Sequence, residues 1–299
     1  MGTKIENLQV TKVVDGDTIK VSLNHKREFL RLDYVDTEES YAEGSKPVTE
    51  AGKAATEMAK QYFSLPNDKL TTVDIEFDGD DPPEICLKKY RDHQGRLICY
   101  VHKDGENYNL KLIEEGWSPY FYKYGYSRIY HREMLAAEAL AQANNLVIWN
   151  RATNLKSARR NYQLLIPWWS LRAGIVDRYR TYGIPAGVLA VRLDYPQIVE
   201  AAEKGEFVTL FYDLQGGITK WLDNGALILD GAKDRWIKLW IPDAKSNKMR
   251  PLLRLLKNRY FGLGRGYVYI SGKVEMYRDK PEIILTDLGQ LSDFPPQIN

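Results

Sequence analysis

Cysteine is scarce in this sequence, with 2 among 299 residues. Two cysteines cannot build a multi-disulfide scaffold or a four-thiolate zinc site. We interpret Cys86 and Cys99 as small apolar residues in neighbouring strands. The 4 histidines share no metal-ligand spacing, so the sequence does not indicate a histidine-based metal centre either.

Long apolar segments are also absent. The longest one, around Leu164 to Val176, is interrupted by Pro167 and Arg172 and is too short and too polar to span a bilayer. We therefore predict no integral membrane segment. The N-terminus has no positive cluster followed by an apolar run, so no signal peptide is expected in this chain. A secreted or cell-envelope location stays open if a leader was trimmed.

The charge of the chain is divided unequally between its halves. Residues 1–150 contain 19 Lys+Arg against 25 Asp+Glu, a net charge of −6, and residues 151–299 contain 23 against 15, a net charge of +8. A basic surface attracts polyanions, whereas an acidic one repels a phosphate backbone unless a cation intervenes. The contrast suggests nucleic acid as a partner and a metal ion in the first half.

Residues 244–274 form the most basic stretch, with eight lysines and arginines and no acidic residue. Apolar residues recur at helical spacing within it, which predicts a helix with one buried stripe and one basic face. The basic residues that we expect to bind phosphates are Lys248, Arg254, Lys257 and Arg259. An ordinary solvated helix face has an equal claim to this pattern.

At 299 residues, the chain is long enough for two modules. In the first, we predict strands over 9–36, 70–77 and 85–102, the last folded about residues 92–95, and helices over 50–64, 109–115 and 129–144. Strands followed by helices indicate an α+β barrel. We place this module at residues 1–150.

In the second half of the chain, we predict a helical linker over residues 151–205 and another module over 206–299. The helices are expected over 157–182 and 195–204, and the strands over 208–214, 226–229, 236–241, 267–277 and 282–286. Five strands with a helix between the third and fourth predict a five-stranded barrel of the oligonucleotide/oligosaccharide-binding (OB) fold.

Three clusters in the first module combine acidic residues with arginine: residues 15–18, 31–39 and 92–96. Asp17 at a turn and Asp36 at a strand end can converge on one hard cation, calcium or magnesium, through oxygen ligands. Arginine can hold two phosphate oxygens with its planar guanidinium, so Arg31 and Arg96 are candidates to flank a phosphodiester at that cation.

Each of these clusters also has a structural interpretation. Asp15-Gly16-Asp17 alone is typical of a hairpin turn. Arg31 can serve as an ion-pair partner of Asp36 or Glu39, and Arg96 as one of Asp92.

Several of these motifs occur together in one order, which is more specific than any one of them. They are Val14-Asp15-Gly16-Asp17-Thr18, Arg31 followed by Val35-Asp36-Thr37 and Glu39, Gly95-Arg96, and Ile148-Trp149. The set resembles the thermonuclease, or staphylococcal nuclease, family over about residues 8–150.

The resemblance implies a calcium-dependent nuclease that hydrolyses phosphodiester bonds of DNA or RNA and leaves 3′-phosphate ends. It implies these roles: Asp17, Asp36 and the Thr37 carbonyl as calcium ligands, Glu39 as the group that orients or deprotonates water, Arg31 and Arg96 as binders of the scissile phosphate, and Tyr122 and Tyr124 as substrate contacts.

Some residues depart from the family pattern. Glu38 stands where the family often has proline, and His93 and Gln94 replace a lysine and a tyrosine beside Arg96. We include His93 and Gln94 among the substrate-binding candidates, with base or terminal-phosphate preference left open.

The last strands are similar to the final hairpin of nucleic-acid-binding barrels, so we interpret the second module as a tether for the substrate. Two other functions are considered. One is a catalytically silent nucleic-acid or protein interaction module. The other is a scaffold whose basic helix and Trp168-Trp169 bind an anionic membrane surface.

Overall fold

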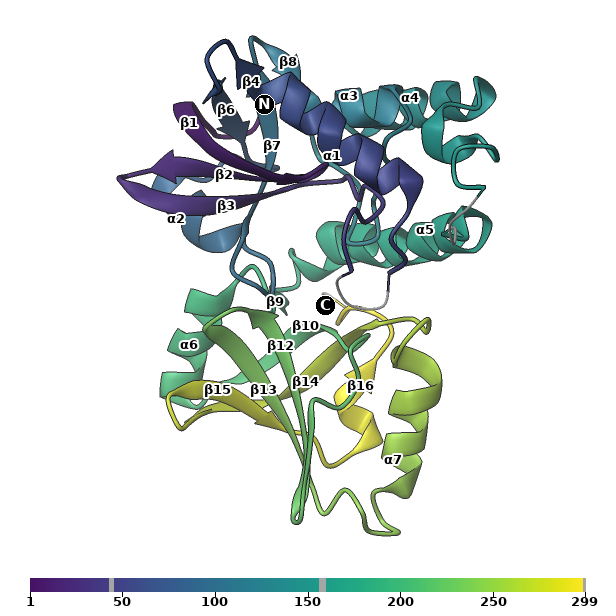
Figure 1. The fold of residues 1–299 in the computed structure, drawn as a ribbon. Coiled ribbons are helices and arrows are strands. Elements are labelled where there is room, and N and C mark those ends of the chain that lie inside the picture. The colour runs from purple at the N-terminus through teal and green to yellow at the C-terminus, as the bar shows by residue number, and fades with distance from the viewer. Residues whose placement is uncertain (43–45, 156–159, 298–299) are drawn as a thin grey trace. The chain divides into compact units, whose positions relative to one another are not determined.

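The computed structural model describes residues 1–42, 46–155 and 160–297 of the chain (Figure 1). The chain separates into two compact units. The first contains residues 1–91, 96–122 and 126–166, and the second contains residues 92–95, 123–125 and 167–299. The module boundaries at residues 150 and 205 stay a prediction. No helix in the described ranges combines the length and the hydropathy needed to cross a bilayer.

The first unit contains a meander, a second group of strands and several helices. Its strands are β1 (Lys4–Asp15), β2 (Thr18–Leu23), β3 (Lys26–Leu32), β4 (Ser64–Leu65), β5 (Lys69–Leu70), β6 (Thr72–Glu76), β7 (Leu97–Lys103) and β8 (Glu106–Asn107). Its helices are α1 (Glu50–Phe63), α2 (Pro83–Lys89), α3 (Tyr108–Glu114), α4 (His131–Ala143), the short 3-10 turn η1 (Val147–Trp149) and the start of α5 (Tyr162–Arg178).

Five strands of this unit close into a barrel. The order is β1-β2-β3-β7-β6, and β6 returns to β1. The closing pair β3–β7 is parallel and joins Leu30 to Leu97, while its neighbours are antiparallel. The interior is apolar, with Ile19, Leu30, Ile75 and Leu97 fully buried. The predicted α+β barrel is therefore confirmed.

The hairpin between β2 and β3 follows from its two turn residues. Asn24 and His25 have φ angles of 49° and 62°, and this left-handed pair is typical of the two-residue turn that matches strand twist. Along β2 and β3 the buried residues alternate with more exposed ones, as a barrel wall requires. The strand run predicted over residues 9–36 is confirmed.

Helix α1 lies against the barrel (Figure 1). The Thr49 hydroxyl caps it by accepting a hydrogen bond from the Gly52 amide at 3.0 Å. Its buried face is built from small residues, Ala51, Ala55 and Ala59, which allow the helix backbone to approach strand β1. The predicted helix over 50–64 is confirmed, as are those over 109–115 and 129–144.

The strand predicted to begin at residue 85 is wrong. Residues 83–89 form helix α2, and only β7 carries strand structure in that region. Pro83 stands at the start of the helix, where its fixed φ and missing amide hydrogen cause no loss. Cys86 is thus on a helix and Cys99 on a strand, so they do not occupy neighbouring strands. Both are buried and free thiols.

The second unit contains a larger sheet and several helical segments. Its strands are β9 (Leu189–Ala190), β10 (Phe207–Asp213), β11 (Lys220–Leu222), β12 (Gly225–Ala232), β13 (Arg235–Pro242), β14 (Tyr267–Tyr277), β15 (Lys280–Ile284) and β16 (Leu291–Ser292). Its helical segments are the end of α5, η2 (Tyr179–Gly183), α6 (Tyr195–Lys204), α7 (Arg250–Leu255), η3 (Leu256–Tyr260) and η4 (Leu288–Gln290).

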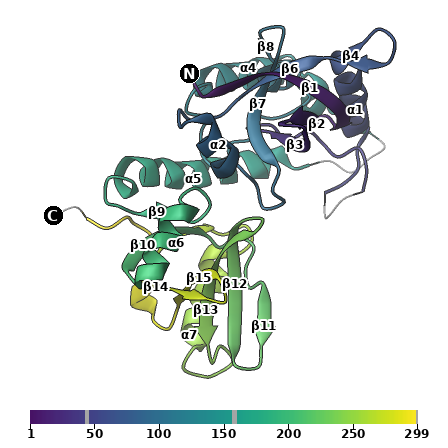
Figure 2. The ribbon, with the colours of Figure 1, turned by 90° about the vertical axis from the view of Figure 1, so that its left-hand side faces the viewer.

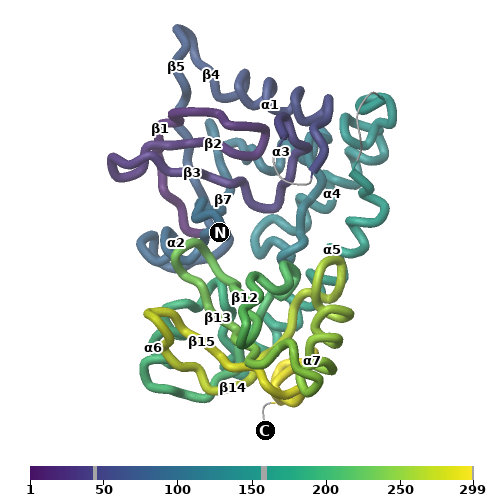
Figure 3. Tube along the Cα trace, turned by 60° about the horizontal axis from the view of Figure 1, so that its bottom comes forward, coloured from purple at the N-terminus to yellow at the C-terminus, as the bar shows by residue number. Residues whose placement is uncertain are grey.

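The sheet of the second unit has the order β11-β12-β13-β15-β14-β10-β9, and Figure 2 labels these strands. Figure 3 shows β12, β13, β14 and β15 from another side. Helix α6 packs on β14 and β15. The predicted strands are present, but a closed barrel is not shown, because no ladder joins β10 to β12 among the described residues. The edge of β10 that does not face β14 pairs in parallel with β9 instead. The Asp213 amide at the end of β10 donates a hydrogen bond to the Asp230 carboxylate of β12 at 3.0 Å.

The predicted basic helix is present as α7 and η3. Its apolar residues Met249, Leu252, Leu256 and Tyr260 are buried in the core of the second unit, as the spacing predicted. The pattern of the sequence thus fixes which face of this helix is solvated.

Arg172, which interrupts the longest apolar stretch of the sequence, is fully buried in the second unit. Its guanidinium pairs with Asp213 at 2.6 Å and lies 4.3 Å from the ring centroid of Tyr267. The rings of Tyr267, Phe211 and Tyr179 continue the stack, with centroid separations of 4.8 and 4.4 Å. Arg172 is therefore a buried residue that connects α5 to strands β10 and β14 of the sheet.

Glu138 is a buried acid on the inner face of α4. Its carboxylate accepts the Tyr120 amide at 3.0 Å, and burial raises its pKa from an ordinary 4.5 to about 7. The folded protein therefore holds a proton on Glu138 that the unfolded chain releases between these two pH values. Stability from this group is present below pH 4.5 and is lost as the pH rises towards 7.

We expect Glu138→Gln to remove this dependence. At pH 8 the variant should be more stable than the wild type by up to about 3 kcal/mol, and at pH 4.5 the two should be alike. Urea unfolding at several pH values measures the difference. Glu133→Gln, an exposed change on the same helix, is the control. A wild-type advantage at pH 8 would contradict the assignment.

Candidate functional site

The acidic loop, residues 36–39, is held against the β1–β2 turn by hydrogen bonds. The Thr37 amide donates to the Asp17 carboxylate at 2.9 Å, and the Leu32 amide donates to the Asp17 carbonyl at the same distance. From the other side, the Ser118 hydroxyl accepts the Asp36 amide at 2.8 Å. The loop is therefore fixed relative to the barrel before any ligand is considered.

The start of helix α1 packs tightly on the same loop. The Thr49 amide donates to the Glu39 carbonyl at 3.1 Å. A Cβ atom at Gly52 would overlap the carbonyl oxygens of Glu38 and Glu39, so only glycine fits there. Helix, loop and turn thus form one rigid support for the acidic side chains.

Arg31 joins the two predicted metal-ligating acids. Its guanidinium nitrogens lie 2.7 Å from an oxygen of Asp17 and 2.7 Å from an oxygen of Asp36. Burial opposes the charge of Arg31, but the two carboxylates outweigh it and raise the pKa of Arg31. The structure therefore brings Asp17, Arg31 and Asp36 together, from the β1–β2 turn, β3 and the acidic loop.

Two more cations reach this cluster. The Lys46 ammonium lies 2.9 Å from Asp36 and 3.2 Å from Glu39. Arg160 pairs with Asp36 at 2.9 Å and with Glu39 at 3.3 Å. Burial disfavours the Asp36 carboxylate, yet Arg160, Lys46 and Arg31 together hold its pKa well below the ordinary value. Asp36 is therefore ionised throughout the physiological range.

Arg160 also binds the backbone of the acidic loop. It donates to the Asp36 carbonyl at 3.0 Å and to the Thr37 carbonyl at 2.9 Å. Arg160 was not expected at the site from the sequence, because it lies beyond the segment that resembles the nuclease family. Lys46 was not expected there either. Neither Arg160 nor Lys46 belongs to a sequence motif. Their positive charge is the one property in the sequence that relates them to the acidic cluster.

Glu38, which departs from the family pattern, is buried beneath the same loop. Its carboxylate accepts the Asn154 side-chain amide at 2.6 Å and the Tyr162 hydroxyl at 3.2 Å. Asn154 in turn accepts the Ala51 amide at 3.0 Å. Glu38 thus connects the acidic loop and α1 to the chain segment that follows residue 150.

The donor types of the cluster fit a hard divalent cation. Asp17 and Asp36 supply carboxylate oxygens and Thr37 supplies a carbonyl oxygen, which are the ligands that calcium prefers. Within the described residues, however, no group of three acidic, histidine or cysteine side chains is arranged for a metal. The oxygens of Asp36 and Thr37 face Arg160 instead.

The remaining catalytic candidate, Arg96, directly precedes β7. Residues 97–99 of β7 pair in parallel with residues 30–32 of β3, so Arg96 lies just before the strand that neighbours the strand of Arg31. His93 and Gln94 are exposed in the turn of residues 92–95, which the Gln94 amide closes by donating to Asp92 at 2.9 Å. The roles of these three residues stay predictions.

The two candidate tyrosines have different surroundings. Tyr122 is 6% exposed and packs between the rings of Tyr120 and Tyr126, at centroid separations of 4.9 and 5.1 Å. Tyr124 is 42% exposed, and the Lys123 ammonium lies 4.9 Å from its ring. Of the two, Tyr124 offers the ring surface that base stacking needs.

Of the tether candidates, Arg254, Lys257 and Arg259 are on the solvated face of α7 and η3, and Lys248 lies in the turn just before α7. Lys248, Arg254 and Lys257 are exposed, and no carboxylate of the described chain pairs with them. Arg259 differs, because it is bound in an ion pair with Asp293. Three of the four predicted residues are therefore available to a polyanion without breaking a contact.

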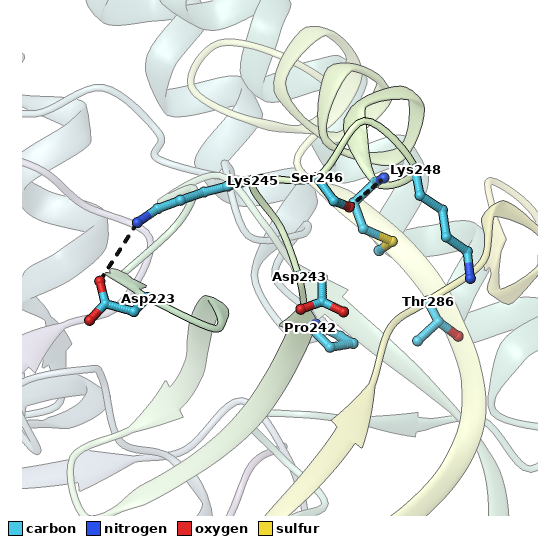
Figure 4. Close-up of a pocket in the computed structure, with 8 residues that line it drawn as sticks. Asp223, Pro242, Asp243, Lys245, Ser246, Lys248 and Thr286 are labelled. Carbon is cyan, nitrogen blue, oxygen red and sulfur yellow. Dashed lines mark hydrogen bonds and ion pairs between the residues drawn. The ribbon is translucent and has the colours of Figure 1, made fainter.

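A cavity of about 370 Å³ lies beside this basic face (Figure 4). Its lining includes Lys245, Ser246, Lys248 and Thr286, and Lys245 reaches towards Asp223 at 3.9 Å. The cavity is small for a nucleotide chain, so we regard the exposed basic face as the more relevant surface.

Comparison with known proteins identifies the first unit. The family described as "Staphylococcal nuclease homologue" matches residues 29–151. "Endonuclease YncB" of Bacillus subtilis (strain 168) is 32% identical over 149 residues, which are 50% of this chain and 64% of that protein. "Thermonuclease" of Staphylococcus hyicus is 33% identical over 146 residues, which are 48% of this chain and 76% of that protein. The chain thus spans less than two thirds of the length of the endonuclease.

The matched range includes Arg31, Asp36, Glu39 and Arg96. Arg160 lies outside it. The residues that the sequence resemblance assigned to catalysis therefore belong to the family region, whereas the cation that contacts Asp36 and Thr37 does not.

We expect Arg31→Gln to destabilise the protein by about 3–5 kcal/mol, because two buried carboxylates lose the cation that they share. Thermal and urea unfolding measure the loss. Arg27→Gln, an exposed change on the same strand, should alter stability by less than about 0.5 kcal/mol. Equal stability of the two variants would show that Arg31 does not compensate the acids.

Proposed function

The chain belongs to the staphylococcal nuclease homologue family, and from that premise we propose that its first unit is a calcium-dependent nuclease. It hydrolyses phosphodiester bonds of DNA or RNA and leaves 3′-phosphate ends. The observation that carries the proposal is the Asp17–Arg31–Asp36 cluster with Glu39 beside it, supported on one rigid loop.

Calcium would be held by Asp17, Asp36 and the Thr37 carbonyl, and when bound it would supply positive charge to the phosphate that is attacked. The residues of the chain supply the other functions. Arg31, and Arg96 from the segment just before the neighbouring strand, bind the equatorial phosphate oxygens, whose negative charge increases in the transition state.

Glu39 is the proposed general base. Its side chain is 18% exposed, so a water molecule can reach it, and Lys46 and Arg160 lie 3.2 and 3.3 Å from its carboxylate. A carboxylate in this place can orient an attacking water and accept its proton. Its backbone is fixed by the bond between the Thr49 amide and the Glu39 carbonyl, so the side chain starts from a defined position.

We further propose that the second unit retains the substrate through Lys248, Arg254 and Lys257, with Arg259 contributing once its pair with Asp293 opens. Exposed, unpaired cations release condensed counterions when they meet phosphates, and this gives binding without sequence preference. The assignment of this unit as an OB-type nucleic-acid-binding domain is part of the same proposal.

A catalytically silent nucleic-acid-binding module is the second candidate. It is favoured by the pairing of Asp36 and Glu39 with Lys46 and Arg160. A membrane scaffold has less support, because Trp169 is buried and the Trp168 indole donates to the Gly264 carbonyl at 3.2 Å. Neither indole is therefore presented to solvent as a membrane anchor needs.

We expect the wild type to cut plasmid and single-stranded DNA in calcium and to lose this activity in a chelator. Glu39→Gln should lower kcat/KM by about 10²–10⁴, the usual contribution of a general base. Glu57→Gln, an exposed acid on α1, is the control. Full activity in chelator or in Glu39→Gln would reject the mechanism, and binding without cleavage by the wild type would favour the silent module.

The tether is tested by the salt dependence of binding to single-stranded DNA in chelator, so that no cleavage interferes. The triple variant Lys248→Gln/Arg254→Gln/Lys257→Gln should reduce the slope of log K against log salt by about 2, because each lost contact contributes about 0.7. The triple variant Lys204→Gln/Lys220→Gln/Lys273→Gln removes equal charge elsewhere in the unit. If the two variants give the same slope, the basic face is not the tether.

A further inference from the structure

We propose that Arg160 is a built-in competitor of the divalent cation: it occupies the oxygens of Asp36 and Thr37 in the metal-free protein and must leave before the ion binds. The inference rests on the proposed function only for the identity of the ion. It makes Arg160, a residue outside the family match, the determinant of metal affinity.

The contacts of Arg160 are those expected of a bound cation. Its guanidinium meets four oxygens, which are the Asp36 side chain at 2.9 Å, the Asp36 carbonyl at 3.0 Å, the Thr37 carbonyl at 2.9 Å and Glu39 at 3.3 Å. Its side chain is 6% exposed. Backbone carbonyls and carboxylates in one cluster attract either a metal ion or an arginine, because both are positive and neither accepts hydrogen bonds.

One donor of Arg160 is left without a partner. Its Nε atom is buried and makes no hydrogen bond within the described part of the chain. A buried N–H without a partner costs its desolvation penalty, so it reduces the stabilisation that Arg160 provides in this position. Arg160 thus satisfies the acidic loop well but is itself incompletely satisfied, which suits a residue that a better cation displaces.

The placement of Arg160 is supported by its neighbour. The Tyr162 hydroxyl binds the buried Glu38 carboxylate, and the Tyr162 ring lies 5.3 Å from that of Trp149. Asn154 binds the other oxygen of Glu38. Glu38, at the position where the family often has proline, therefore fixes residues on both sides of Arg160.

The charge balance of the cluster explains why the two cations exclude each other. Arg31, Lys46 and Arg160 already pair with the acids Asp17, Asp36 and Glu39. A divalent ion that entered while all three cations stayed in place would meet their repulsion in a largely buried site, which is costly. Lys46 is 46% exposed and can turn into solvent, whereas Arg160 must be displaced from carbonyls that the ion itself needs.

The test is calorimetric titration of the full chain with calcium chloride, without nucleic acid. Arg160→Gln should lower the calcium Kd by roughly tenfold or more, since removing one unit charge from contact with the ion changes binding at least this much. Arg160→Lys keeps the charge and should stay near the wild type. Arg151→Gln, an exposed arginine in the preceding segment, is the matched control and should not change Kd.

A second measurement separates competition from a general loss of structure. Without metal, Arg160→Gln should have a lower melting temperature than the wild type, and calcium should raise that temperature more than it does in the wild type. Tyr162→Phe keeps the ring and loses the hydrogen bond to Glu38. It should also lower the metal-free melting temperature and enlarge the increase that calcium causes, both by less than Arg160→Gln does. It provides the same test should Arg160→Gln fail to fold.

The inference and the nuclease proposal fail separately. Equal calcium Kd in Arg160→Gln, Arg151→Gln and the wild type overturns the competition, even if the wild type cuts DNA in calcium. Absence of calcium binding in all variants overturns it too. Tighter calcium binding in Arg160→Gln supports the competition even if no variant cuts DNA, and in that case only the nuclease proposal is lost.

Discussion

The structure of the first unit depends on the compensation of two buried carboxylates by Arg31. Asp17 and Asp36 lie on different segments, and without a shared cation their mutual repulsion and desolvation would force the β1–β2 turn and the acidic loop apart or protonate one acid. Arg31 meets both at 2.7 Å from the adjoining strand. A planar guanidinium with several donors can bridge two acids, which a lysine ammonium does less well.

The barrel and helix α1 make that compensation possible by holding the backbone still. The Thr37 and Asp36 amides are bonded to Asp17 and Ser118, and Gly52 allows α1 to approach the carbonyls of the loop. Because the backbone is fixed, the carbonyls of residues 36 and 37 remain directed at one position whatever cation occupies it. This position favours a positively charged group that binds oxygen atoms. A metal ion and an arginine side chain both have these properties.

Much of this could be predicted from the sequence, where local patterns carry the information. The Asp15–Asp17 turn, the alternation of β2 and the small-residue stripe of α1 are short-range features, and the barrel follows from them. The prediction of a strand from residue 85 was wrong, because a short apolar run does not distinguish a strand from a helix. Pro83, at the first turn of α2, favours the helix. The closure of a second barrel was not predictable, since it depends on whether β9 or β12 pairs with the edge of β10.

The contacts around Glu38 and Arg160 have no local signature at all. Glu38 and Asn154 are 116 residues apart, and Asp36 and Arg160 are 124 residues apart. Periodicity and motif spacing report on neighbours within a few residues, so a pairing of this range appears only in the folded chain. Since these contacts involve residues beyond the family match, the resemblance predicts Arg31, Asp36, Glu39 and Arg96 as site residues but gives no signal for Arg160. One of the cations that face the acidic loop therefore comes from the segment that follows the barrel.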